Sequence, residues 1–341
     1  MTPHRAATPT EATRDHAMTA RVVRRVPLIY ASGADAFTDR PAHVRASSGM
    51  AWIGERLAVV QDDANFVALV DTRSGQCEVV VLPAGHGGLR QFDDGRGNKR
   101  YKHDFEALVA VRNNPTLLIA FGSGSSSRRE HILVIADASS SPSDVRVVPM
   151  PQFYAGLRAC EEFAGSELNV EGAALVGENI RLFNRGNGAV SGALGPVNAT
   201  CDINSAALLL HVHDPSHHAA PLPRHVVQFV LGEIEGVRLS FTDAVAVGDS
   251  VIYAAAAEDS PDAVRDGAVS GSAIGVIHTR NGRTAAVWAP LTLADGTLAR
   301  VKVEGIVKGH RLGQFFIVVD RDAHDQPSEL MELEVSGFSL G

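Results

Sequence analysis

The chain has 341 residues, of which 45% are apolar and 21% charged, as is usual for a folded protein of one large or two ordinary domains. Its formal net charge of −8 argues against a nucleic-acid partner, because neutralising phosphates requires a basic face. No apolar run approaches the roughly 20 residues of a membrane-spanning helix, so we expect no membrane partner either.

The N-terminal residues 1–20 are polar and predict a disordered tail, followed by a single domain over residues 21–341. The tail contains no apolar stretch typical of a secretory signal. Cys77, Cys160 and Cys201 are an odd number without CxxC spacing, which favours free buried thiols in a reducing compartment. We therefore expect a cytoplasmic monomer.

One pattern recurs five times along the chain: a polar residue, a small residue, an apolar strand, a turn, and a second apolar strand that ends in polar residues. The five segments are residues 47–63, 104–124, 169–188, 240–260 and 302–322. Further strand-like segments follow each of the first four, but only ELMELEVS (329–336) follows the fifth, whereas RVVRRVPLIYA (21–31) is left over at the start.

This pattern predicts an all-β fold, a five-bladed β-propeller of four-stranded blades. The N-terminal strand near residues 22–29 would pair with residues 329–335 and close the ring, which hides the sheet edges. Six blades would need one more blade from sequence without the pattern.

Two segments between the repeats stand out. Residues 153–168 have helical spacing and predict a short helix. Residues 205–213 are interpreted as a strand, and the histidines of HVHDPSHH (211–218) at its end are either a transition-metal site or, as we favour, a polar loop.

Equivalent positions of the five repeats hold oxygen-bearing side chains, spaced by 58, 65, 71 and 62 residues; these marker residues are Ser48, Glu106, Glu171, Thr242 and Glu304. Since the first strand of every blade lines the propeller channel, all five should face one axis. Three carboxylates so close repel one another unless they are neutralised. A hard divalent cation, Ca²⁺ or alternatively Mg²⁺, would neutralise them; the other interpretation is that they bind water or pair with Lys and Arg from the loops.

The order of these residues, in SSGMAW, DFEALVAV, NVEGAAL, SFTDAVAV and KVEGIVK, resembles that of the calcium-dependent soluble nucleotidases (apyrases), a family of five-bladed propellers. In that family Ser, Glu, Glu, Ser and Glu face a central calcium, so the resemblance implies the marker residues as metal ligands, with Thr242 in place of the second Ser. The "EG" strands are also similar to those of phytase-like and esterase-like bacterial propellers.

Polar residues at the ends of the second strands and in the preceding loops should surround the channel on the same face. Candidate catalytic bases are Asp62, Asp63, Glu258 and Asp320, with Asp322 beside the last; candidate substrate-binding residues are Lys102, His103, Arg128, Arg185 and Arg321. Cations for substrate oxygens and carboxylates for metal or water are the mixture that an anionic substrate requires.

We therefore predict a metal-dependent hydrolase of a phosphorylated or otherwise anionic small molecule. A non-catalytic binding module with a structural cation and a lactone or ester hydrolase are the alternatives, because a propeller fold alone does not determine function.

Overall fold

The computed structural model describes residues 8–111, 114–137, 144–259, 267–280, 282–321 and 323–338. The fold is mostly β, and its strands form groups in which consecutive strands pair antiparallel. The first group comprises β4 (Ser47–Ile53), β5 (Arg56–Gln61), β6 (Phe66–Val70) and β7 (Gln76–Val81), with β3 (Ile29–Tyr30) at its edge. The second comprises β8 (Phe105–Val111), β9 (Asn114–Gly122), β10 (His131–Ile135) and β11 (Val145–Pro149).

The remaining groups follow in chain order. The third comprises β12 (Val170–Val176), β13 (Asn179–Asn184), β14 (Asn198–Asn204) and β15 (Arg224–Val230). The fourth comprises β17 (Val237–Val247), β18 (Ser250–Asp259), β19 (Ala268–Arg280) and β20 (Arg283–Thr292), with β16 (Glu233–Ile234) beside β17. The last comprises β21 (Lys302–Lys308), β22 (Gln314–Asp320) and β23 (Glu329–Ser336), joined by β2 (Thr19–Pro27).

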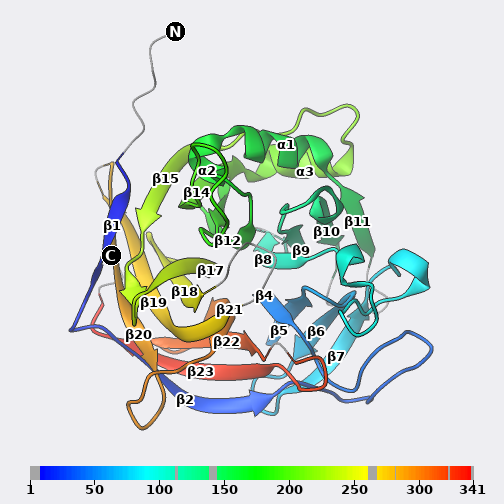
Figure 1. Cartoon of the computed structure of the whole chain (residues 1–341). Coiled ribbons are helices and arrows are strands. Elements are labelled where there is room, and N and C mark those ends of the chain that lie inside the picture. The colour runs from blue at the N-terminus through cyan, green and yellow to red at the C-terminus, as the bar shows by residue number, and fades with distance from the viewer. Residues whose placement is uncertain are drawn as a thin grey trace.

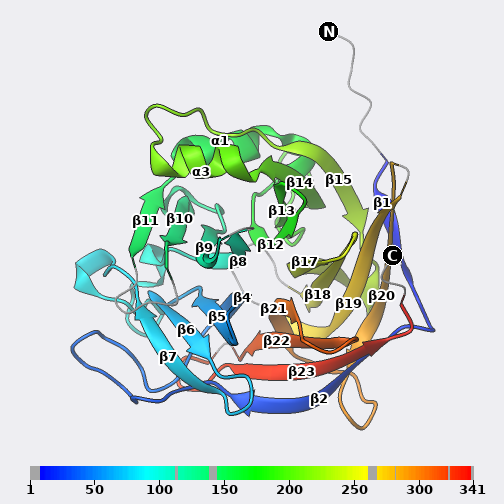
Figure 2. The same cartoon turned by 180° about the vertical axis from the view of Figure 1, so that it is seen from behind.

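The groups are arranged radially around one axis, with β4, β8, β12, β17 and β21 innermost (Figures 1 and 2). Each of these strands contacts the next, and β21 contacts β4, so the inner strands form a closed ring. The arrangement is propeller-like, and it places the first strand of each repeat at the centre as the sequence predicts.

The hydrophobic core lies between neighbouring groups. For example, Met50 and Val59 of the first group pack in one cluster with Val307 and Phe316 of the last. Separate clusters fill the other contacts between adjacent groups. Most strands are therefore apolar on both faces, because each sheet packs against two neighbours.

The N-terminal segment closes the ring as predicted. Strand β2 pairs antiparallel with β23, from Thr19 opposite Ser336 to Pro27 opposite Glu329. The expectation of a disordered tail over residues 1–20 is wrong for its described part. Strand β1 (Thr10–Arg14) runs parallel to both β15 and β20, because those outer strands offer unpaired edges to the polar segment.

The helical prediction for residues 153–168 is confirmed by α1 (Pro151–Ala159) and α2 (Glu161–Ala164). The strand expected at residues 205–213 is instead α3 (Ser205–His213), whose first turn is capped by the side chain of Asn204. The short 3₁₀ turns are His86–Gly88, Lys99–Tyr101 and Ser127–Arg129. Among the described residues no helix is long and apolar enough to cross a membrane.

The three cysteines are reduced; Cys77 and Cys201 are buried as predicted, whereas Cys160 is half-buried.

Candidate functional site at the centre of the ring

Each inner strand carries a β-bulge at its marker residue. The strand register shifts between Phe105 and Ala107, and between Val170 and Gly172, so that Glu106 and Glu171 are left without a cross-strand partner. The same shift occurs at Thr242, Glu304 and Ser48. A bulge re-aims the extra side chain, and all five marker residues are buried. The pattern that recurs in the sequence therefore corresponds to a β-bulge that recurs in each inner strand.

A glycine follows three of the bulged residues and allows the inner strands to approach closely. A Cβ on Gly305 would lie 2.5 Å from the carbonyl oxygen of Ser48, and one on Gly49 would lie 2.5 Å from that of Glu106. Gly172 faces the backbone of Asp243 in the same way, at 2.9 Å. The ring can close this tightly only because these positions have no side chain.

A cavity of about 290 Å³ opens at one end of the ring. Nine carboxyl groups and six cationic side chains line it. The carboxyl groups are Asp62, Asp63, Asp93, Asp94, Asp104, Glu106, Glu171, Glu304 and Asp320, and the cations are Arg45, Lys99, Lys102, Arg129, Arg185 and Lys302. This central cavity is polar and carries both signs of charge, as the sequence predicts.

Three of these carboxyl groups form a compact acidic triad, Asp62, Asp104 and Glu106, whose oxygens all lie within 4.8 Å of one another. Asp62 follows β5, whereas Asp104 and Glu106 lie at the start of β8 in the next group. Three oxygen ligands at this spacing can hold a metal ion. Among the described residues it is the only such group of His, Cys, Asp and Glu side chains.

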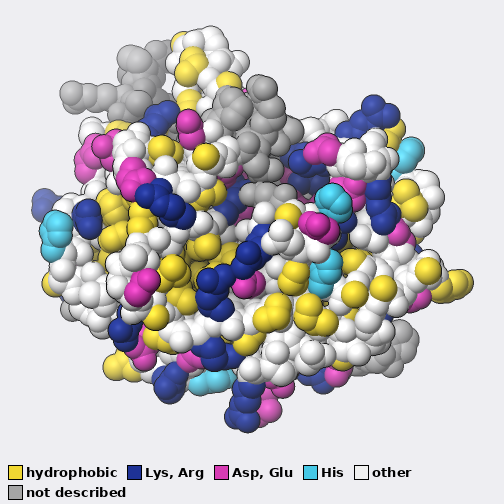
Figure 3. Space-filling view, turned by 60° about the horizontal axis from the view of Figure 1, so that its bottom comes forward, with side chains coloured by type: hydrophobic (Ala, Val, Ile, Leu, Met, Phe, Trp, Pro, Cys, Tyr) yellow, Lys and Arg dark blue, Asp and Glu magenta, His cyan; other side chains and the backbone are white. Residues whose placement is uncertain are grey.

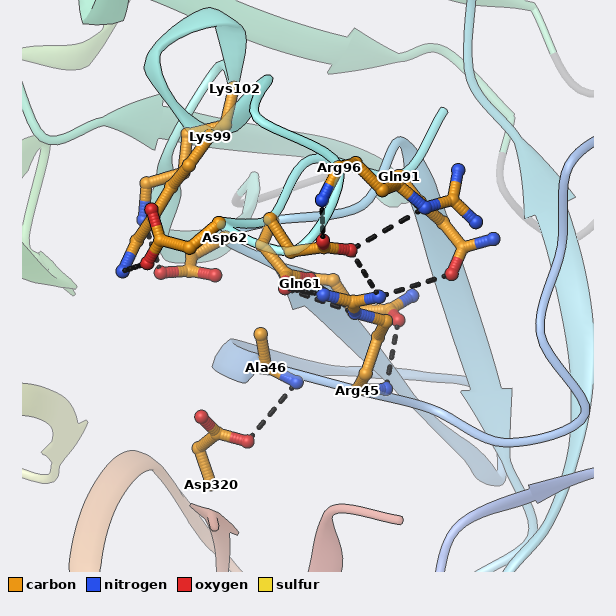
Figure 4. Close-up of polar contacts among 12 residues, drawn as sticks. Arg45, Ala46, Gln61, Asp62, Gln91, Arg96, Lys99, Lys102 and Asp320 are labelled. Carbon is orange, nitrogen blue, oxygen red and sulfur yellow. Dashed lines mark hydrogen bonds and ion pairs between the residues drawn. The ribbon is translucent and has the colours of Figure 1, made fainter. Parts of the chain in front are cut away.

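A lysine ammonium lies within the same triad. Lys102 Nζ is 2.6 Å from Asp62 Oδ2 and 2.6 Å from Asp104 Oδ1, and the contact with Asp62 is visible in Figure 4. Although burial opposes its charge, the carboxylates of Asp104 and Asp62 raise the pKa of Lys102 well above its ordinary value. Burial would raise the pKa of Asp104, but Lys102 and Arg129 hold that pKa below its ordinary value.

Glu106 is held by the hydroxyl group of Ser48. The Ser48 hydroxyl lies 2.6 Å from Glu106 Oε2 and 2.9 Å from the Glu106 carbonyl oxygen. The Ser48 hydroxyl is the donor in both contacts, so the two Glu106 oxygens share its one proton. Burial, reinforced by the charge of Glu171, raises the pKa of Glu106 well above its ordinary value.

The central cavity also borders a second group, here called the Arg185 cluster: Arg185, Lys302, Glu171, Glu258 and Glu304. Arg185 binds Glu258 through Nη2 and lies 3.5 Å from Glu171 through Nη1. Lys302 Nζ lies 2.9 Å from Glu304 Oε1. Three carboxyl groups and two cations therefore form this cluster, and all five side chains are buried.

Burial raises the pKa of Glu304 from its ordinary 4.5 to about 8. An unfolded chain releases this proton near pH 4.5, so between pH 4.5 and 8 the folded state binds more protons and loses stability as the pH rises. We expect the free energy of unfolding to fall over this window, by at most about 1.4 kcal/mol per pH unit for one group. Urea unfolding at pH 5 to 9 in chelator, compared between the wild type and Glu304→Gln, measures the effect. Equal pH slopes in both proteins would contradict it.

The predicted catalytic carboxylates are held by different partners. Asp62 belongs to the acidic triad, and Glu258 to the Arg185 cluster. Asp63 is bound by Arg45, whose Nε lies 3.0 Å from each of its oxygens; burial and the charge of Asp62 raise the pKa of Asp63 to about 7. Asp320 lines the central cavity and accepts a hydrogen bond from the backbone of Ala46 at 3.1 Å (Figure 4). Asp322 lies outside the described residues.

Of the predicted substrate-binding residues, Lys102 and Arg185 line the central cavity, but His103, Arg128 and Arg321 do not. His103 packs against His131 with ring centroids 4.7 Å apart, and burial lowers its pKa to about 4. Arg128 lies over the ring of Tyr101, and Arg321 pairs with Glu329 on β23 at 2.8 Å. These three side chains do not line the cavity, because each contacts another residue outside it.

Sequence reasoning missed Arg45, Asp93, Asn169 and Lys302. Two of them carry a readable signal: Asn169 and Lys302 precede the marker residues Glu171 and Glu304 by two positions, as Asp104 precedes Glu106. Side chains two apart on a strand share a face, so this second layer of cavity residues follows from the marker positions. Arg45 precedes β4 in an irregular segment and has no such signal.

The histidines of residues 211–218 lie on and after α3. His211 Nδ1 is 2.6 Å from the carbonyl oxygen of His218, and the cluster contributes to no metal-type group in the described part of the chain. On the face shown in Figure 3, Lys and Arg side chains lie interspersed with Asp and Glu rather than in a patch of one sign.

Comparisons with solved structures give similarities of low identity. The chain is similar to a glutaminyl cyclase of Myxococcus xanthus, with 10% identity, 96% of this chain and 100% of that chain covered, and a TM-score of 0.47. An α-L-arabinofuranosidase of Podospora anserina is 10% identical over 94% of this chain and 96% of that chain, with a TM-score of 0.46. A calcium structure of a Trichoderma reesei carbohydrate-active enzyme of family AA12 is 10% identical over 98% and 100%, with a TM-score of 0.46.

With TM-scores below 0.5, these similarities say nothing about function. No curated protein matches the chain. Residues 43–335, which include all the lining residues of the central cavity, match the model of a family of unknown function (DUF6929), and the chain therefore belongs to that family.

Proposed function

We propose that the central cavity is the active site of a calcium-dependent hydrolase that acts on a phosphorylated or otherwise anionic small molecule. The observation that carries this proposal is the acidic triad, with its oxygens within 4.8 Å, at the wall of a cavity of about 290 Å³. Cationic side chains on the same walls are suited to bind an anion.

The donor set of the triad fits a hard cation, since Asp62, Asp104 and Glu106 offer only oxygen ligands; Ca²⁺ is favoured and Mg²⁺ is the second choice. Ser48 forms a hydrogen bond with Glu106. Glu171 instead pairs with Arg185, and Glu304 pairs with Lys302. We therefore assign the cation to the triad rather than to all five marker residues. A bound divalent cation polarises the scissile group of an ester or anhydride.

The chain's own residues would bind and orient the substrate. Arg129 Nη1 is 2.9 Å from Asp104 and lines the cavity, so it places a guanidinium next to the triad. Lys102, once withdrawn from the carboxylates, supplies a second positive charge. Asp320 is the candidate general base, because it lines the cavity outside the triad.

The test is a panel of p-nitrophenyl phosphate, nucleoside diphosphates and a lactone, assayed with Ca²⁺, with Mg²⁺ and with chelator. We expect Ca²⁺-dependent hydrolysis of a phosphate ester or anhydride, lost at least a hundredfold in Glu106→Gln together with Ca²⁺ binding. Glu178→Gln, the same change at an exposed position in the β12–β13 turn, should leave both unchanged. Activity that survives chelator, or in Glu106→Gln, would refute the proposal.

The second candidate is a non-catalytic binding module with a structural cation. It is favoured by one observation: Lys102, Arg185 and Lys302 already pair with the buried carboxylates. Ca²⁺ binding that stabilises the fold without hydrolysis of any panel member would support this candidate.

We further infer that the fold is a five-bladed propeller. The support is the repeated bulge at the marker residues, the closed contacts among β4, β8, β12, β17 and β21, and the pairing of β2 with β23. The resemblance to apyrases extends to the marker positions and is part of this proposal.

A further inference from the structure

We propose that the side of the central cavity next to the Arg185 cluster binds the hydroxyl groups of the ligand, so that the substrate is an anionic sugar or polyol. This inference names the substrate class and rests on the proposed function. It starts from polar atoms that are buried in the cavity wall and have no hydrogen-bond partner in the protein: Arg185 Nε, Asn187 Oδ1 and Glu304 Oε2.

Such atoms are unusual, because burying a polar atom without a partner destabilises a fold. Arg185 and Glu304 are 4% and 6% exposed, and both line the cavity. Asn187 lies in the loop that follows β13, and its neighbour Asn184 is tied to the backbone of Asn169 and Val197. The fold therefore holds the three unpartnered atoms in the cavity wall, where a ligand in the cavity could form hydrogen bonds with them.

The charge of this side indicates a neutral ligand group rather than a phosphate. Because the pKa of Glu304 is raised to about 8, at most two carboxylates face the two cations at neutral pH, and the cations have no surplus positive charge to attract a phosphate. The unpartnered atoms include a donor, Arg185 Nε, an acceptor, Asn187 Oδ1, and Glu304 Oε2, which accepts or, when its carboxyl group is protonated, donates. A hydroxyl group donates and accepts at once, so it satisfies both kinds of atom.

The acidic triad and Arg129 line the same cavity and would hold the anionic group. A ligand that spans the cavity then has a charged end and a hydroxyl-bearing end. A simple phosphate or an alkyl phosphate would leave Arg185 Nε, Asn187 Oδ1 and Glu304 Oε2 without partners.

The test is calorimetric binding in Ca²⁺ of matched probes. Glycerol 1-phosphate and ribose 5-phosphate carry hydroxyl groups, propyl phosphate has the same three carbons as glycerol phosphate without them, and phosphoethanolamine carries an ammonium. We expect the better of the two hydroxylated probes to bind at least tenfold more tightly than propyl phosphate. Asn187→Ala should reduce that preference to less than threefold while its affinity for propyl phosphate stays unchanged.

Asn179→Ala is the matched control, because Asn179 is also half-buried but lies at the opposite end of β13. Glu304→Gln, which keeps the size of the side chain, is the second variant should Asn187→Ala unfold. Equal affinities of wild type for the hydroxylated probes and propyl phosphate, no binding of any probe, or tighter binding of phosphoethanolamine would overturn the inference. If the protein hydrolyses a member of the substrate panel but does not bind hydroxylated probes more tightly, this inference alone is refuted. If it binds hydroxylated probes more tightly but hydrolyses nothing, only the proposed function is refuted.

Discussion

Replacing Lys102 by glutamine is expected to raise the affinity for Ca²⁺ at least tenfold, or by about 1.4 kcal/mol. The ammonium of Lys102 lies 2.6 Å from both Asp62 and Asp104, in the space where a cation would bind. In the wild type, Ca²⁺ must displace this charge and break two buried ion pairs. In Lys102→Gln the carboxylates have no competing cation, and calorimetry on chelator-treated protein measures the difference.

Lys99→Gln is the control, because it removes the same charge from the cavity wall but from a lysine paired with the exposed Asp94. Its effect on Ca²⁺ affinity should stay below threefold. Without Ca²⁺, Lys102→Gln should be destabilised by about 3 kcal/mol, since breaking a buried ion pair leaves a charge uncompensated, and Ca²⁺ should restore stability. Unchanged or weaker Ca²⁺ binding would show that Lys102 is the permanent partner of these carboxylates and that the triad is not a metal site.

Substituting Gly305 by alanine is expected to destabilise the fold by about 3 kcal/mol, at the upper end of the cost of overpacking. The new Cβ would lie 2.5 Å from the carbonyl oxygen of Ser48 on the neighbouring inner strand. The Ser48 oxygen and the Cα that carries the new Cβ belong to backbone that the ring holds in place, so no flexible side chain can move to relieve the clash. Urea unfolding of the variant measures the loss.

Gly195→Ala serves as the comparison, because a Cβ there meets no heavy atom within 4 Å, so the change should not destabilise the fold. Glycine also costs conformational entropy on folding, so alanine stabilises by about 0.4–1 kcal/mol wherever it fits. A Gly305→Ala protein as stable as the wild type would therefore mean that the inner strands do not approach as closely as described.

The marker residues illustrate how much of the site the sequence could predict. Ser48, Glu106, Glu171, Thr242 and Glu304 are recognisable because each sits at the same place in a repeat, and all of them lie at bulges of the inner strands. The pairing of Glu171 and Glu304 with cationic side chains agrees with the alternative interpretation that these acidic residues pair with Lys and Arg, although Lys302 comes from a strand rather than from a loop. Lys302 neutralises Glu304 from the same strand, and Arg185 neutralises Glu171 from the end of the next strand.

The errors have local causes. Residues 205–213 contain an apolar run that suits a strand or a helix equally well, and the side chain of Asn204 caps the helix that forms. The segment at residues 10–14 is polar, yet it forms a strand because β15 and β20 offer edges to which its backbone can bond.

The sequence by itself determined the β class, the five inner strands with their marker residues and the closing role of the N-terminal segment, because strand periodicity and repetition are local properties of the chain. Only the tertiary structure decided which charges meet. Asp62 and Asp104 come from different strand groups and share Lys102, and Arg45 reaches Asp63 from an irregular segment. Distances between side chains far apart in the chain depend on how whole sheets pack, and that packing decides where a cation and a ligand can bind.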